Sequence, residues 1–194
     1  MKITKSAFKT SVASAKNILI DDKPQIAFVG RSNVGKSSLI NMLVGNSKLA
    51  KTSSTPGRTR LINYFLINDE FYFVDLPGYG YAKASKNMVY EWQSLIEPYL
   101  IHNDSLKCVC VLVDSRHEPS DQDKQMVNFL SYYNIPFIII ATKCDKHTKS
   151  ALKPALLKVA NSMMVGVGNV YGVSAQTRYG KDEILAKLDD MLSI

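Results

Sequence analysis

An apolar run, a glycine-rich loop and a helix follow one another near the start of the chain, and few folds accommodate that order. The run Gln25–Gly30 predicts a buried strand, and Lys36–Val44 places its apolar residues at helical spacing. Between them, Gly30–Ser37 has the pattern G-x-x-x-x-G-K-S, in the strand-to-helix context that this motif requires. Backbone N–H groups of such a loop wrap phosphates, and the helix dipole adds a favourable field. The segment therefore predicts a phosphate-binding loop, with Lys36 on the β and γ phosphates and Ser37 on Mg²⁺.

Strands and helices alternate along the rest of the chain. Strands are expected at Leu61–Ile67, Phe71–Asp75, Leu106–Asp114, Pro136–Thr142 and Asn169–Ser174, the first two as a hairpin. Helices are expected at Asn87–Leu100, from the N-cap Ser120 to about Tyr133, at Ser150–Met164 and at Asp182–Leu192. This alternation predicts a mostly parallel sheet covered by helices on both faces. Because ligands bind at the carboxyl ends of such strands, motifs at strand ends are the most informative.

The positive charge is unevenly distributed. The chain has 24 basic and 17 acidic residues, a formal net charge of +7. No acid lies between Asp22 and Asp69, and that stretch holds seven bases, so the remainder is balanced at 17 against 17. An uncompensated segment of this kind suits a polyanion such as nucleotide phosphates or RNA. A merely soluble basic surface explains the charge alone equally well.

Length and composition exclude several classes of protein. The 194 residues suffice for one domain with a full core. The longest apolar runs, near Cys108–Val113 and Pro136–Ala141, are far shorter than the ~20 residues of a membrane helix. No apolar signal-peptide core follows Met1, and the three cysteines form no disulfide framework. We therefore expect a cytoplasmic protein without a membrane partner.

The next motif, Asp75-Leu76-Pro77-Gly78, stands at the end of the strand Phe71–Asp75. The carboxylate of Asp75 could bind Mg²⁺ through a water, and the N–H of Gly78 could contact the γ-phosphate. A threonine in the long loop Gly45–Arg60 would complete the metal ligands in the triphosphate state. Thr55 and Thr59 are both candidates for that role. Thr59 is favoured because it stands just before the following strand.

A base-recognition motif, Thr142-Lys143-Cys144-Asp145, follows the apolar run Ile138–Ala141. The carboxylate of Asp145 can accept hydrogen bonds from guanine N1–H and the 2-amino group, and adenine offers neither. Charge-assisted hydrogen bonds are worth roughly 1.5–3 kcal/mol each, so discrimination would be strong. Lys143 would lie along the base with its head on the phosphate-binding loop. After the last strand, Ser174-Ala175-Gln176 offers the Ala175 N–H to guanine O6.

The set GRSNVGKSS, KTSSTPGRTR, VDLPGYGYAK, VDSRHEPSDQD and ATKCDK closely resembles the EngB family of bacterial GTP-binding proteins. That family belongs to the TRAFAC class of GTPases, in the TrmE–Era–EngA–EngB–Septin-like superfamily. The resemblance implies a three-layer Ras-like P-loop NTPase G domain over residues 23–194, with one antiparallel strand, and residues 1–22 as an N-terminal extension packed on it. It also implies Mg²⁺, GTP hydrolysis as a molecular switch, assembly of the large (50S) ribosomal subunit, and a need for the protein in cell division and septation.

The resemblance also assigns the site residues. Lys36, Thr59 and Gly78 are expected to be catalytic, and Ser37 and Thr59 to bind the metal, with Asp75 acting through water. The expected GTP contacts are Gly30, Arg31, Ser32, Asn33, Val34, Gly35, Lys36, Ser37, Ser38, Gly57, Arg58, Thr59, Arg60, Leu61, Asp75, Leu76, Pro77, Gly78, Thr142, Lys143, Cys144, Asp145, Val173, Ser174 and Ala175. Thr142 stands where many GTPases have asparagine, which is usual in this family and leaves guanine selection to Asp145.

Tyr79 occupies the position, directly after D-x-x-G, where Ras-like enzymes orient the attacking water with a glutamine. Intrinsic hydrolysis should therefore be slow and stimulated by a partner or a monovalent cation. Asn33 resembles the asparagine of potassium-stimulated relatives, although a turn residue fits that position equally well. Gly45–Arg60 and Leu76–Lys86 are expected to be the two moving segments of the switch.

Several alternatives remain open. The bases Lys48, Lys51, Arg58 and Arg60 could contact ribosomal RNA, and Tyr79 and Tyr81 could stack on its bases or pack locally. Two competing functions are an adenine-nucleotide kinase or ATPase, and a GTP-dependent regulator of cell division that acts through a protein partner. The chain is expected to be a monomer. Asp114, Arg116 and His117 are left outside the predicted site.

Overall fold

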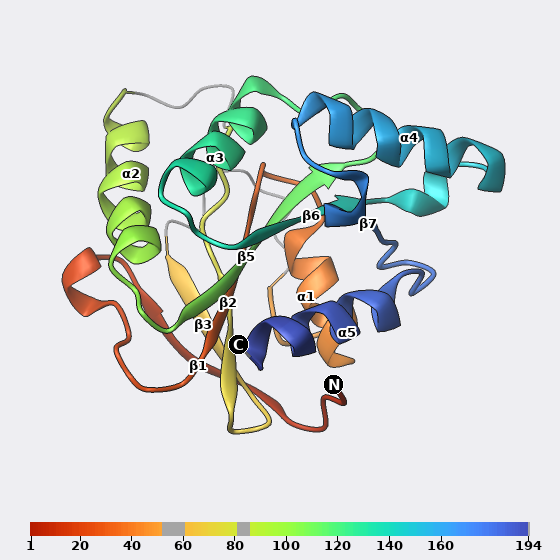
Figure 1. Ribbon diagram of the computed structural model, residues 1–194. Helices are drawn as coiled ribbons and strands as arrows, with labels where there is room; N and C mark the ends of the chain where they lie inside the picture. The colour runs from red at the N-terminus through yellow and green to blue at the C-terminus, as the bar shows by residue number, and fades with distance from the viewer. Residues whose placement is uncertain (52–60, 81–85, 194) are drawn as a thin grey trace.

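The computed structural model of the chain describes residues 1–51, 61–80 and 86–193 (Figure 1). Its middle layer is a seven-stranded sheet in the order β1-β3-β4-β2-β5-β6-β7. The strands are β1 Ser6–Val12, β2 Gln25–Gly30, β3 Ile62–Ile67, β4 Phe71–Asp75, β5 Leu106–Asp114, β6 Phe137–Thr142 and β7 Val170–Gly172.

Strand β3 is the one strand of this sheet that runs in the opposite direction to the others. It pairs antiparallel with β1 and with β4, whereas β2 pairs parallel with β4 and β5, and the β5–β6 and β6–β7 pairs are parallel. The predicted mostly parallel sheet with one antiparallel strand is confirmed. So is the hairpin of β3 and β4, which turns at Asn68 and Asp69, both with positive φ.

Helices cover both faces of the sheet, as predicted (Figure 1). One face packs against α2, α3 and α4, and the other against α1 and α5. The α-helices are α1 Lys36–Val44, α2 Lys86–Ile101, α3 Asp121–Tyr132, α4 Lys149–Ser162 and α5 Lys181–Leu192, with short 3₁₀ turns η1 Ala15–Asn17, η2 Cys144–Lys146 and η3 Val167–Asn169. The predicted cap at Ser120 is confirmed, because its hydroxyl accepts from the N–H of Asp123 at 3.3 Å.

The first strand was not predicted. Strand β1 lies at one edge of the sheet, and only Val12 in it is buried. It is held chiefly through its backbone pairing with β3, so its side chains carry little hydrophobic alternation. The bulge between Phe8 and Thr10 interrupts what alternation there is. The division of the chain at residues 22 and 23 stays a prediction.

The central strands fix the position of the site. Every residue of β2 and β4 is buried, and both are interior strands of the sheet, so their apolar side chains pack against helices on both faces. Burial of this extent determines the register, since a slip of one residue would reverse every side chain. The carboxyl ends of β2, β4, β5 and β6 are thereby brought together. None of the helices in the described part of the chain combines the length and hydropathy of a membrane span.

Candidate functional site

The loop between β2 and α1 curls back over the carboxyl end of β2. Asn33 and Gly35 have φ of 64° and 107°, and Gly35 directly precedes the first residue of α1. Asparagine and glycine are the residues that adopt such a left-handed backbone most readily. Thr142 Oγ1, at the end of β6, donates to the Val34 carbonyl at 2.7 Å.

Lys36 and Asp75 form a buried ion pair beside this loop. The Nζ of Lys36 donates to Oδ1 of Asp75, and the two side chains are only 12% and 7% exposed. Lys36 opens the helix after β2, and Asp75 ends β4, which is the parallel neighbour of β2. The pairing of the two strands thus places a phosphate-binding cation next to a carboxylate that suits a metal ion.

The segment after Asp75 lies against the phosphate-binding loop. Tyr79 N–H donates to the Gly30 carbonyl at 3.3 Å, and Ser32 N–H donates to the Tyr79 carbonyl at 3.2 Å. A Cβ at Gly78 would come within 3.1 Å of the Gly30 oxygen and 3.3 Å of the Ser32 nitrogen, so a larger residue would push the two segments apart. The Ser32 hydroxyl is buried, with no hydrogen-bond partner among the described residues.

The Tyr79 side chain turns away from the loop and is 9% exposed. Its hydroxyl donates to Oδ1 of Asp123 at 2.8 Å, and its ring meets Trp92 edge to face at 6.1 Å. Burial, with the nearby Asp123 carboxylate, raises the pKa of Tyr79 well above its usual value. Tyr79 therefore packs locally, which is one of the two interpretations that the sequence left open. Tyr81 lies outside the described residues.

Asp145 is held in place by the neighbouring motif. Oδ1 of Asp145 accepts from the Ser174 hydroxyl at 2.7 Å, and Oδ2 pairs with Lys146 at 2.9 Å. These contacts lower the pKa of Asp145, the Ser174 hydrogen bond first and Lys146 second, so the carboxylate stays ionised. Cys144 N–H donates to the Val173 carbonyl at 3.0 Å, which joins the two motifs through their backbones as well.

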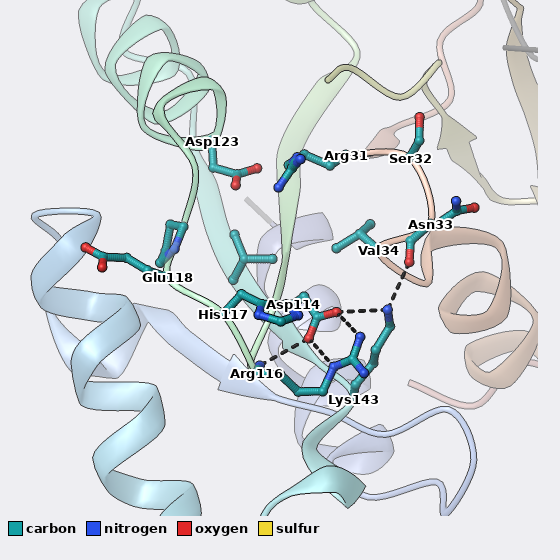
Figure 2. A pocket seen from close by; sticks show the side chains of 12 residues that line it. Arg31, Ser32, Asn33, Val34, Asp114, Arg116, His117, Glu118, Asp123 and Lys143 are labelled. Carbon is teal, nitrogen blue, oxygen red and sulfur yellow. Dashed lines mark hydrogen bonds and ion pairs between the residues drawn. The ribbon is translucent and has the colours of Figure 1, made fainter. Parts of the chain in front are cut away.

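Lys143 connects the phosphate-binding loop to Asp114 at the end of β5 (Figure 2). Its Nζ donates to the Asn33 carbonyl at 3.0 Å and to Oδ2 of Asp114 at 2.9 Å. Arg116 holds the same carboxylate with two hydrogen bonds, from Nε to Oδ1 at 2.9 Å and from Nη2 to Oδ2 at 2.7 Å. Burial alone would raise the pKa of Asp114, but the Arg116 and Lys143 hydrogen bonds outweigh it and hold that pKa far below its usual range. A cavity of about 250 Å³ lies beside this cluster and the phosphate-binding loop.

Sequence reasoning therefore missed Asp114 and Arg116 as members of the site. Asp114 ends β5, which lies between the strand that leads into the phosphate-binding loop and the strand that leads into Lys143. An acid at the end of the strand between those two loops, followed two residues later by an arginine, was the available signal. His117 is exposed, as expected.

The predicted positions from the phosphate-binding loop, from Asp75–Gly78, and from the two base-side motifs lie together at the carboxyl ends of β2, β4, β6 and β7. Gly57, Arg58, Thr59 and Arg60, with the competing Thr55, lie outside the described residues.

Known proteins resemble this chain over almost its whole length. Residues 25–143 match the family described as 50S ribosome-binding GTPase. The probable GTP-binding protein EngB of Prosthecochloris aestuarii is 46% identical over 190 residues, which cover 98% of each chain. That of Clostridium acetobutylicum is 47% identical over 192 residues, covering 95% of this chain and 93% of its own. The chain belongs to the EngB family of GTP-binding proteins.

Solved structures agree with this assignment at the level of the fold. The crystal structure of a probable EngB protein has a TM-score of 0.72 at 23% identity and covers 87% of this chain and 98% of its own. Era, crystallised with MgGDPNP and nucleotides 1506–1542 of 16S ribosomal RNA, has a TM-score of 0.65 at 22% identity, with 85% and 55% covered. The Ras-like G domain expected of an EngB chain is confirmed, and membership of the family makes it a GTPase domain.

Removing the Asp114 carboxylate should weaken nucleotide binding by this EngB chain. Asp114→Ala leaves Lys143 without one of its two partners, and a charge-assisted hydrogen bond of roughly 1.5–3 kcal/mol corresponds to about tenfold or more in affinity. Calorimetric titration with GDP measures the effect. Asp104→Ala, at an exposed acid before β5, is the matched control. Wild-type affinity in a folded Asp114→Ala variant would refute the role of this carboxylate.

Proposed function

We propose that this chain is a GTP-driven switch that acts in assembly of the large ribosomal subunit. The observation that supports GTP as the ligand is the contact between the phosphate-binding loop and the base-recognition motif. Lys143 joins the phosphate-binding loop to the motif that holds Asp145. The guanine base would then lie against Asp145 and Ala175, and the phosphates against the loop and Lys36. An adenine base would offer the ionised Asp145 neither of the two hydrogen bonds that guanine can donate.

Mg²⁺ fits the residues present. Ser37 and Asp75 supply a hydroxyl and a carboxylate, the hard oxygen donors that Mg²⁺ binds together with phosphate oxygens. The buried, unpartnered Ser32 hydroxyl and the closely packed Gly78 lie at the same place, where a terminal phosphate would reach. Ser37 and Thr59 would hold the ion directly and Asp75 through water. When bound, the ion would neutralise charge on the phosphates.

The position of Tyr79 supports slow intrinsic hydrolysis as part of this proposal. Its hydroxyl is engaged by Asp123 within the protein, and a phenol has no amide with which to orient water. A partner or potassium would then supply the missing contribution. The left-handed backbone of Asn33 supports a turn role, and its exposed side chain leaves its oxygen accessible to a cation. Lys36, Gly78 and Thr59 would stabilise the phosphate charge that develops during the reaction.

The large subunit and its RNA are the proposed partners. The family description, 50S ribosome-binding GTPase, supports this, as does the acid-free stretch after Asp22. We place the protein in the cytoplasm as a monomer, and its effect on cell division and septation would follow from ribosome assembly. A regulator of division that acts through a protein partner is the competing function.

Asp145→Asn should change the base that is preferred. The amide can no longer accept two hydrogen bonds from guanine, but its NH₂ group can donate to the 2-carbonyl of xanthine. We expect GTP affinity to fall at least tenfold and XTP to bind more tightly than GTP. Calorimetry with GTP, XTP and ATP tests this, with Asp104→Asn as the control. If ATP binds wild-type protein as tightly as GTP does, the guanine assignment fails.

Potassium should raise the turnover of GTP. Phosphate release is measured in potassium and sodium buffers of equal ionic strength, for the wild type and for Asn33→Gly. Glycine keeps the left-handed backbone and removes the side-chain oxygen, so this variant should lose the stimulation. Equal wild-type rates in the two buffers would reject the cation.

The ribosomal proposal predicts nucleotide-dependent binding to subunits. The protein should pellet with isolated large subunits in the presence of a non-hydrolysable GTP analogue, and less with GDP. Small subunits are the control. Absence of pelleting in both nucleotide states would exclude the ribosomal role and favour the protein partner.

A further inference from the structure

A second acid-free stretch lies in the C-terminal half of the chain. Residues 146–181 contain six bases and no acid. This stretch and the earlier one, residues 23–68, hold thirteen of the 24 bases and none of the 17 acids. Elsewhere the chain is acidic, with 11 bases against 17 acids. The net positive charge is thus confined to two segments, and the second one contains α4.

Helix α4 lies at the outside of the molecule, beside β7 at the edge of the sheet (Figure 1). Val159 and Ala160 pack into the core and fix the orientation of the helix. Its three lysines, Lys149, Lys153 and Lys158, are all exposed. No described residue forms an ion pair or hydrogen bond with any of their ammonium groups. The helix contains no acid that could neutralise them.

Small and polar side chains lie between Lys153 and Lys158 on the helix surface. Ser150, Pro154 and Asn161 are exposed on the side opposite Val159 and Ala160. Lys153 and Lys158 flank this side and stand about 7.5 Å apart along the helix axis. Lysine, serine and asparagine are among the side chains that contact nucleic-acid phosphates and sugars. We call Lys149, Lys153 and Lys158 with these three residues the α4 surface.

We propose that the α4 surface binds the phosphate backbone of RNA. Within the proposed function, which this inference rests on and deepens, that RNA is the RNA of the large subunit. Three unneutralised ammonium groups on one helix match the regular negative charge of a polynucleotide. Their contacts with phosphates would release counterions from the RNA, and this release would drive binding. In the described part of the chain, none of the three lysines forms an ion pair or hydrogen bond with Asp145 or Lys36, so the surface needs no change in the nucleotide site.

RNA fits this surface better than a lipid bilayer does. A helix that binds in the membrane interface needs a broad apolar face free to enter the acyl region. The apolar face of α4 packs against the core, and Leu157 is the one large apolar side chain of this helix that is exposed. Phosphate contacts need only the exposed cations and polar groups that α4 presents.

The test replaces the three lysines together. Lys149→Ala/Lys153→Ala/Lys158→Ala is compared with Lys2→Ala/Lys9→Ala/Lys16→Ala, which removes three exposed lysines from the N-terminal segment around β1. Binding to large subunits, and to RNA extracted from them, is measured across a salt titration with the GTP analogue bound. The α4 variant should bind both more weakly, and the slope of log K against log salt should fall by about one per lysine lost. GDP affinity should match the wild type.

Each other outcome has a distinct meaning. An unchanged slope in the α4 variant, or an equal loss in the control variant, overturns the proposal. Loss of subunit binding with unchanged binding to free RNA means that α4 contacts a ribosomal protein, and also overturns it. Wild-type protein that binds neither subunits nor free RNA overturns both this proposal and the ribosomal role. Wild-type protein that binds free RNA through α4 but no subunits upholds the α4 surface and refutes the ribosomal role.

Discussion

The parallel pairing of β2 with β4 on one side and β5 on the other is the constraint from which the site follows. Because carboxyl ends of parallel strands meet at one end of the sheet, three loops from distant parts of the sequence become neighbours. The Lys36–Asp75 pair is a direct consequence, and the parallel pairing of β5 with β6 adds the Asp114–Lys143 pair in the same way. Burial of every residue in β2 and β4 sets their register, and a slip of one residue in either strand would separate Lys36 from Asp75.

Tyr79 connects that rigid frame to the elements around it. Its backbone bonds to the phosphate-binding loop, its hydroxyl bonds to the first turn of α3, and its ring packs on Trp92 of α2. Trp92 in turn donates to the Pro77 carbonyl at 2.8 Å. A displacement of Gly78 must therefore break contacts with two helices as well as with the loop. A phosphate-dependent change at this point would alter the surface formed by α2 and α3.

Sequence reasoning succeeded where a local pattern determines a local structure. The motif around Lys36, the run of isoleucines before Lys143 and the cap at Ser120 each place one element and its neighbours in the chain. It failed for β1, whose stability comes from backbone pairing with a strand that lies 50 to 61 residues further along the chain. It also failed for Asp114, because the partner that gives this residue its role, Lys143, is brought near only by the β5–β6 pairing. The acid at the end of the strand and the arginine two residues later are visible in the sequence, but their contact with Lys143 depends on a strand pairing that neither segment encodes alone.

The charges of the molecule fall into two groups with different physical roles. Several charged groups at the site lie beside opposite ones, as in the Lys36–Asp75 pair and the Asp145–Lys146 pair. Such pairs fix geometry and contribute little long-range field, because their charges cancel at a distance. The lysines of α4 have no such partner among the described residues, so their field extends into solvent. Nucleotide recognition can therefore depend on precise contacts, whereas attraction to a polyanion depends on charge that is left uncancelled elsewhere on the surface.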